Sequence, residues 1–157
     1  MVVAFTGHRT YQHSAEEELR TTILSLYNQG ARIFRVGMAE GFDLAAAEAV
    51  IEIMDQSRDI TLEAYVPWQG FNTRFCGQEQ ERYQGVLKRC NTITVISEGY
   101  RPWVFRERND RLVEGADYVV AWWNGSSSGT GYTVRKAQKG LSKVINLYPA
   151  QQLSMEL

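Results

Sequence analysis

Apolar and polar residues follow two different periodicities along the chain. Short apolar runs rich in β-branched and aromatic residues predict buried strands, and longer segments with apolar residues at helical spacing predict helices. The runs that predict strands cover 2–5, 31–36, 61–66, 92–96, 117–123 and 144–147. The segments that predict helices cover 15–29, 42–54, 72–90, 102–115 and 130–139. Strands and helices therefore alternate along the chain.

This alternation predicts an α/β fold, with a mainly parallel sheet covered by helices on both faces. Right-handed crossovers between parallel strands make a Rossmann-like three-layer sandwich the expected topology. No linker, repeat or low-complexity tract divides residues 1–157, so we expect a single domain. Residues from Tyr148 onward carry little pattern, and we expect them to form a terminal extension.

The first predicted helix has sequence signals at both ends. Ser14 stands three residues before Glu17, which is the spacing of a capping box. Gly30 follows the last apolar position and favours the end of the helix there. We therefore expect a side-chain cap at Ser14.

The stretch 117–147 contains the most informative loop of the chain. An apolar run, a loop of glycine and hydroxyl residues, a segment with helical spacing and a second apolar run predict a strand, loop, helix and strand. In parallel sheets, ligands bind beyond the carboxyl ends of the strands, where Gly125 to Gly131 would lie. Glycines let the backbone approach a ligand, and free N–H groups at a helix start attract phosphate. A solvated loop is the alternative interpretation.

The other strand exits carry polar and glycine residues as well, and in a parallel sheet all of these exits gather at one edge. Backbone N–H groups and hydroxyls there suit phosphate, an arginine suits its charge, and aromatic rings suit stacking. The predicted ligand-binding residues are Thr6, Gly7, His8, Arg9, Gly37, Met38, Ala39, Glu40, Gly41, Asp43, Trp68, Ser97, Asn124, Gly125, Ser126, Ser128, Gly129, Thr130 and Gly131.

Several of these residues also have a purely structural interpretation. His8 can satisfy a turn, Arg9 can pair with a surface carboxylate, and Asp43 can cap the helix that begins nearby. Glu40 can be an exposed loop carboxylate rather than an acid or base. The charged run 106–111 is expected to be the solvated face of its helix.

Composition describes an ordinary globular protein, with 157 residues, 44% hydrophobic residues and a net charge of −1. This balance removes the broad electrostatic argument for nucleic acid, which is therefore expected to be an unlikely partner. No signal peptide and no run long enough to cross a bilayer is recognisable, so we expect a cytoplasmic protein without a membrane partner. Cys76 and Cys90 stand apart from other ligand residues, so no metal is expected.

Four motifs, in this order, resemble the YpsA-like branch of the SLOG superfamily. They are ThrGlyHisArg from Thr6, GlyMetAlaGluGlyPheAspLeuAlaAlaAlaGlu from Gly37, ArgAsnAspArgLeuValGluGlyAlaAsp from Arg108 and GlySerSerSerGlyThrGlyTyrThr from Gly125. The resemblance implies a Rossmann-like fold and a pocket for a nucleotide or an ADP-ribose-like ligand. It implies no particular reaction. Because relatives in the superfamily often associate, it also implies a possible homo-oligomer.

Related families in the superfamily include the lonely-guy phosphoribohydrolases, which use a glycine-rich loop followed by glutamate. Gly129 and Thr130 match part of that loop, but Tyr132 and Thr133 stand where the acidic residue would be expected. The chain is also distantly similar to nucleoside deoxyribosyltransferases, which use a carboxylate nucleophile. If the protein is an enzyme, Glu40 or Asp43, which follow the strand predicted at 31–36, would have to supply the catalytic carboxylate.

Three functional hypotheses follow. The leading one is a nucleotide-binding or nucleotide-sensing domain, with the phosphate held by the loop 125–131. The sequence leaves the cofactor unknown. The second is a hydrolase or transferase acting on the N-glycosidic bond of a nucleotide. The third, which the related DNA-processing protein A family suggests, is single-stranded nucleic-acid binding. Its residues would be Arg101, Arg106, Arg108 and Arg111, with Trp103 nearby.

Overall fold

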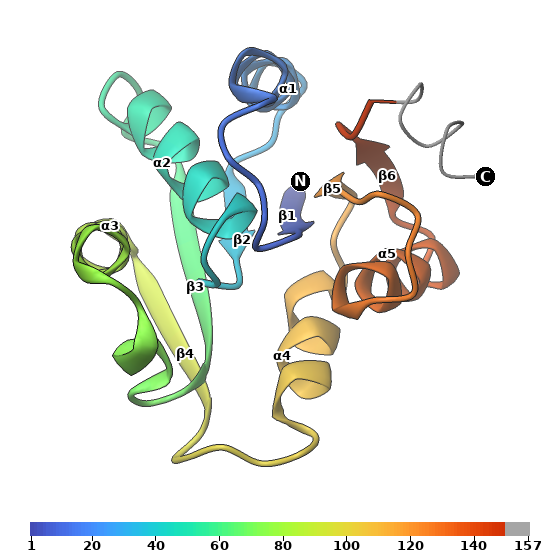
Figure 1. Ribbon diagram of the computed structural model, residues 1–157. Helices are drawn as coiled ribbons and strands as arrows, with labels where there is room; N and C mark the ends of the chain where they lie inside the picture. The colour runs from blue at the N-terminus through green and yellow to red at the C-terminus, as the bar shows by residue number, and fades with distance from the viewer. Residues whose placement is uncertain (150–157) are drawn as a thin grey trace.

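The structure is a computed structural model, and it describes residues 1–149 (Figure 1). Most of the terminal extension expected after Tyr148 lies outside the described residues. The strands are β1 (Val2–Gly7), β2 (Ile33–Val36), β3 (Thr61–Trp68), β4 (Thr92–Ser97), β5 (Tyr118–Trp122) and β6 (Lys143–Asn146). The helices are α1 (Glu16–Asn28), α2 (Phe42–Met54), α3 (Gly77–Arg89), α4 (Val104–Val113) and α5 (Gly129–Lys139), with a short 3-10 helix, η1 (Phe71–Arg74).

The strands form one parallel sheet of six strands in the order β4-β3-β2-β1-β5-β6. The chain winds outward from β1 to β4 and then returns to the other side of β1 with β5. In Figure 1, α1, α2 and α3 cover one face of the sheet, whereas α4 and α5 cover the other. The predicted α/β, Rossmann-like three-layer architecture is therefore confirmed.

Most predicted elements agree with the structure, and α2 has the predicted bounds. The strand β3 is longer than expected, because Pro67 and Trp68 continue it instead of ending it. Trp68 pairs with Ser97 of β4, so the pairing with a neighbouring strand extends β3. The helix expected over 72–90 is divided into η1 and α3.

The core lies between the sheet and the helices that face it. Phe5 of β1 and Phe34 of β2 stack with ring centroids 6.2 Å apart, and Leu19 and Ile23 of α1 are fully buried in the same cluster. The first turns of α2 are buried on all sides, since every residue from Phe42 to Ala47 is buried. Within residues 1–149, no helix is long and apolar enough to cross a membrane.

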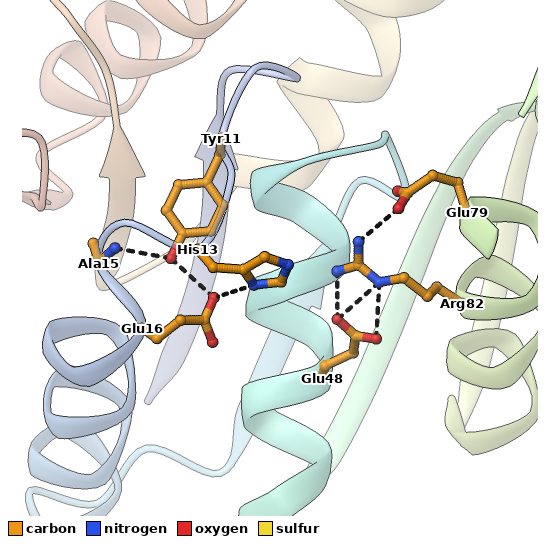
Figure 2. Close-up of polar contacts among 7 residues, drawn as sticks. All are labelled: Tyr11, His13, Ala15, Glu16, Glu48, Glu79 and Arg82. Carbon is orange, nitrogen blue, oxygen red and sulfur yellow. Dashed lines mark hydrogen bonds and ion pairs between the residues drawn. The ribbon is translucent and has the colours of Figure 1, made fainter. Parts of the chain in front are cut away.

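The start of α1 is fixed by a tyrosine, and the predicted capping box is wrong. Ala15 is the N-cap residue, and no side chain caps the helix there. The Tyr11 hydroxyl instead accepts a hydrogen bond from the Ala15 N–H at 3.2 Å and donates one to Glu16 at 3.0 Å (Figure 2). His13 also contacts Glu16, with Nδ1 2.8 Å from Oε1. Burial raises the pKa of Tyr11 to about 12, so its hydroxyl stays protonated and able to donate.

A charged side chain ties α2 to α3 on the helical layer. Arg82 of α3 donates from Nε to both carboxylate oxygens of Glu48 on α2, at 3.1 and 3.2 Å (Figure 2). Its Nη1 donates to Glu79 of its own helix at 2.8 Å. Because these bonds are charge-assisted and in part bidentate, they fix the position of α3 beside α2.

The carboxyl end of β1 lies in direct contact with the start of α2. A Cβ atom added at Gly7 would stand 2.5 Å from Cβ of Phe42, whose ring is buried in the core. Only a residue without a side chain lets the two elements approach this closely. This approach brings the loop after β1 next to the loop before α2.

We predict that Gly7→Ala lowers the free energy of unfolding by about 1–3 kcal/mol, because the added methyl group overpacks the contact with Phe42. The matched control is Gly85→Ala within α3, where an added Cβ meets no atom within 4 Å. That change should raise stability by up to about 1 kcal/mol, because alanine favours a helix more than glycine does. Urea unfolding monitored by circular dichroism measures both. Equal effects of the two substitutions would contradict the close approach.

Candidate functional site

A cavity of about 590 Å³ opens at the carboxyl ends of β1 and β5. These two strands are neighbours in the sheet, and the order of strands reverses between them. Parallel α/β sheets bind their ligands at such a reversal, and the volume is in the range of pockets for small molecules. The cavity is lined by Thr6, Gly7, His8, Arg9, Thr10, Ala39, Asp43, Phe71, Phe105, Arg108, Asn109, Leu112, Asn124, Ser126, Ser128, Gly129 and Thr130.

The exit of β1 is connected to the exit of β5 through His8. Its backbone N–H donates to the carbonyl of Trp122 at 3.3 Å. Its ring atom Nε2 lies 3.0 Å from Oδ1 of Asn124 and 3.1 Å from the backbone nitrogen of the same residue. His8 therefore positions the loop after β5 while it also lines the cavity.

The glycine and serine loop leads directly into α5, and its beginning lines the cavity. Ser128 is the N-cap residue of α5, and its hydroxyl accepts a hydrogen bond from the N–H of Gly131 at 3.1 Å. The N–H of Ser126 donates to Asn124 at 3.0 Å. A Cβ atom at Gly131 would stand 2.6 Å from the carbonyl oxygen of Ser126, so this glycine is needed to fold the loop against its own helix.

The start of α2 contributes a buried carboxyl group to the cavity. Asp43 is only 5% exposed, and its Oδ2 accepts a hydrogen bond from the N–H of Ala39 at 3.1 Å. Burial raises the pKa of Asp43 to about 6, although the positive charge of Arg108 and the Ala39 hydrogen bond act in the opposite direction. Such a group can change protonation state near neutral pH, which is a property common at functional sites.

The buried partner of this carboxyl group is Arg108 of α4, which is 7% exposed. It donates from Nε to Oδ1 of Asn109 at 2.8 Å and from Nη1 to the carbonyl of Gly37. Burial lowers the pKa of Arg108, and the charge of Asp43 raises it. The guanidinium has five N–H donors, and these two bonds use two of them.

The expectation of a solvated charged face on α4 is wrong at Arg108 and Asn109, since both are buried and line the cavity. Val104, Arg108 and Leu112 recur at intervals of four residues and are all buried. Because residues four apart share a helix face, Arg108 lies on the same inner face as Val104 and Leu112. That spacing was the available signal, and the resemblance motif that starts at Arg108 was another.

The cavity brings together most of the predicted residues of the first and fifth strand exits, but not all of the predicted site. The predicted residues outside its lining are Gly37, Met38, Glu40, Gly41, Trp68, Ser97, Gly125 and Gly131. Met38 is fully buried, and Gly41 has a φ of 77° in close contact with the backbone of Arg9. Glu40 is partly exposed in the same loop. Met38, Glu40 and Gly41 therefore belong to the loop that precedes Asp43, outside the cavity lining.

The cavity also contains aromatic residues that the sequence interpretation missed. Trp68 was expected to supply a stacking surface, but Phe71 and Phe105 line the cavity instead. Trp68 packs against both of them, with ring centroids 5.2 and 5.5 Å away. Phe71 belongs to η1, which has no distinct sequence pattern, and Phe105 falls in a run dominated by charged residues.

The residues that replace the expected acidic position after the glycine loop have other contacts. The Tyr132 hydroxyl donates to Asp110 at 2.7 Å, and Thr133 is fully buried with its hydroxyl donating to the carbonyl of Gly129 at 2.9 Å. Among residues 1–149, Asp43 is the one carboxylate in the cavity lining. The same part of the chain contains no group of three or more His, Cys, Asp or Glu residues arranged to hold a metal ion.

The fold and the cavity together define a Rossmann-like α/β protein with a ligand-sized site at the reversal of strand order. The model of the YpsA family, described as the YspA SLOG family, matches residues 3–156. The chain therefore belongs to this SLOG family, which confirms the resemblance found in its motifs. A UPF0398 protein from Bacillus pumilus (strain SAFR-032) is 19% identical over 171 residues, which cover 99% of this chain and 88% of that protein.

Two solved structures share the fold. DNA processing protein A from Helicobacter pylori, whose structure gives insight into a unique single-stranded DNA binding mode, superposes with a TM-score of 0.67 and 20% identity over 92% of this chain. The same protein from Streptococcus pneumoniae gives a TM-score of 0.66 and 18% identity over 90% of this chain. The present chain spans 63% and 48% of the lengths of those two proteins.

The expectation that nucleic acid is an unlikely partner is corrected by this comparison. It rested on the net charge of −1. A protein that shares the fold has a single-stranded DNA binding mode, so the fold gives no reason to exclude nucleic acid. Net charge is a property of the whole surface, whereas binding depends on the local arrangement of charges.

We predict that Asp43 makes stability depend on pH in a defined direction. Its folded pKa of about 6 lies above the ordinary value of 3.8 for an aspartate, so the folded state binds the proton more tightly. Between pH 7 and pH 5 the wild type should therefore gain about 1 kcal/mol of unfolding free energy relative to Asp43→Asn. Urea unfolding of both proteins at the two pH values measures this difference. Parallel changes in the two proteins would contradict the raised pKa.

Proposed function

We propose that this protein binds or senses a nucleotide or an ADP-ribose-like ligand in the cavity between β1 and β5. The loop 125–131 and the first turn of α5 would hold a phosphate group, and the rest of the ligand would extend toward the loop 37–43. Arg9 would neutralise phosphate charge. The cytoplasmic location expected from the sequence stays a prediction.

The observation that carries this proposal is the placement of the α5 N-terminus in the cavity wall. Ser126, Ser128, Gly129 and Thr130 all line the cavity, and they precede or begin a helix of 11 residues. The N–H groups at a helix start have no partners within the helix, and the helix dipole adds positive potential there. Both features favour an anionic group such as phosphate.

The charged side chains in the lining support the same ligand class. Arg9 and Arg108 are cationic, and Asp43 is the one carboxylate among the described lining residues. An arginine such as Arg9 can offer a phosphate group several N–H donors at once, which a lysine cannot do with the same geometry. Asp43, at the start of α2, can accept a hydrogen bond from a sugar hydroxyl, as acidic residues do in dinucleotide-binding folds.

We predict that Arg9→Gln weakens the binding of AMP or ADP-ribose by about ten-fold, because a charge-assisted bond to phosphate is lost. Arg58→Gln is the matched control, since Arg58 is exposed in the loop before β3, at the amino end of the strands. Isothermal titration calorimetry after a thermal-shift screen measures both variants. The proposal fails when no nucleotide or ADP-ribose derivative stabilises the wild type at millimolar concentration.

Turnover of the ligand is the alternative use of the same site. The hydrolase or transferase hypothesis depends on a carboxylate, and Asp43 is in the cavity whereas Glu40 is outside its lining. With a pKa of about 6, Asp43 can exchange a proton near neutral pH. Free base released from nucleoside monophosphates by the wild type, and lost in Asp43→Asn, would identify an enzyme.

Single-stranded DNA is a second candidate ligand, favoured by one group of exposed residues. Tyr100, Trp103 and Phe105 are 58%, 53% and 40% exposed, and Arg101 and Arg106 lie among them in the sequence. Exposed rings beside arginines are typical of surfaces that stack unpaired bases and contact phosphates. Arg108, which the sequence assigned to this surface, is instead buried in the cavity.

We predict that DNA binding at this surface weakens steeply with salt, since each neutralised phosphate releases counterions. Fluorescence anisotropy of a labelled single-stranded oligonucleotide between 50 and 200 mM salt measures the effect. For two or three phosphate contacts, the affinity should fall by about ten-fold over this range. The double variant Arg101→Gln and Arg106→Gln should reduce the salt dependence. Binding that is insensitive to salt and to both arginines would exclude this candidate.

A further inference from the structure

Two phenylalanines from different elements form an aromatic wall in the cavity. Phe71 comes from η1 and Phe105 from the first turn of α4, and their ring centroids are 6.1 Å apart with an angle of 70° between the ring planes. Neither belongs to the strand exits that carry the phosphate-facing residues. Phe105 is 40% exposed although many apolar side chains of the chain are fully buried. This wall is therefore accessible to a ligand that enters the cavity.

Surrounding rings hold the wall in position. Trp68 makes edge-to-face contacts with Phe71 and Phe105, and also with Tyr100 at 5.5 Å. Phe75 packs edge-to-face against Phe71 at 5.6 Å. Edge-to-face networks of this kind fix ring orientation, so a planar ligand meets a preformed surface.

A buried cation adjoins the same wall. Cζ of Arg108 lies 5.9 Å from the ring centroid of Phe105, and both residues line the cavity. A nucleobase combines a flat aromatic face with nitrogen and oxygen acceptors at its edge. Aromatic rings beside an arginine with remaining N–H donors match both properties, since the rings stack and the guanidinium donates.

We propose that Phe71 and Phe105 form a subsite for a nucleobase, so that the ligand class is a base-bearing nucleotide and not a sugar phosphate. This inference rests on the proposed function, because it needs the phosphate group to be held by the loop 125–131 of the same cavity. The base contacts both rings, with its face stacked on one ring and its plane edge-to-face with the other, and Arg108 donates to an acceptor at the edge of the base.

The subsite predicts a difference in affinity between ligands with and without a base. Stacking on an aromatic side chain strengthens binding by about ten-fold or more per base. In isothermal titration calorimetry, the best of AMP, GMP, CMP, UMP and ADP-ribose should bind the wild type at least about ten-fold more tightly than ribose 5-phosphate.

The variants Phe71→Leu and Phe105→Leu should each lose about ten-fold of the nucleotide affinity while the affinity for ribose 5-phosphate is unchanged. Phe105→Tyr keeps an aromatic face and should retain nucleotide binding. Tyr118→Leu is the matched control, because Tyr118 begins β5 at the amino ends of the strands and lies outside the cavity lining. Thermal melting of each variant establishes that it is folded, and the Phe105→Tyr result stands even when a leucine variant is unstable.

The possible failures are distinct. Equal affinity of the wild type for nucleotides and for ribose 5-phosphate overturns the base subsite and leaves the phosphate site intact. The same holds when Tyr118→Leu reduces nucleotide affinity as much as the two lining variants do. When neither nucleotides nor ribose 5-phosphate bind, the proposed function fails together with the subsite.

Discussion

The site depends on one constraint, which is that the chain leaves β1 toward one edge of the sheet and returns to the opposite side of it with β5. Helices on opposite faces then follow the two neighbouring strands, so their loops diverge and leave a cavity between them. Gly7 allows the loop after β1 to approach Phe42 at the start of α2, and His8 connects it to Asn124 in the loop after β5. Three strand exits are thereby held around one space.

Two charged side chains are buried beside this space, and burying a charged group costs free energy. Asp43 and Arg108 come from helices on opposite faces of the sheet. Burial raises the pKa of Asp43 and lowers the pKa of Arg108, so it favours the neutral form of each group. Their mutual attraction and the hydrogen bonds to Ala39, Gly37 and Asn109 offset part of that cost. Replacing such a buried pair by apolar residues of similar volume often leaves a protein equally stable, so the pair is not needed for stability alone, which fits the proposed ligand-binding role.

The SLOG family model gives the family of this chain, and the two solved structures share its fold. The cavity itself adds chemical detail. A helix N-terminus and Arg9 suit phosphate, whereas Phe71, Phe105 and Arg108 suit a planar group with acceptors at its edge. A nucleotide carries both kinds of group in one molecule.

The sequence by itself determined the order of the elements, the α/β architecture and the strand exits that face the cavity, because periodicity and glycine placement are local properties of the chain. It also predicted that Asp43 and the loop before α5 lie at these strand exits. Only the tertiary structure decided that Arg108 and Phe105 line the cavity, that Tyr11 fixes the start of α1 in place of Ser14, and that Glu40 stays outside the lining. Such contacts join residues far apart in sequence, so they depend on how helices pack across the sheet, which no local pattern encodes.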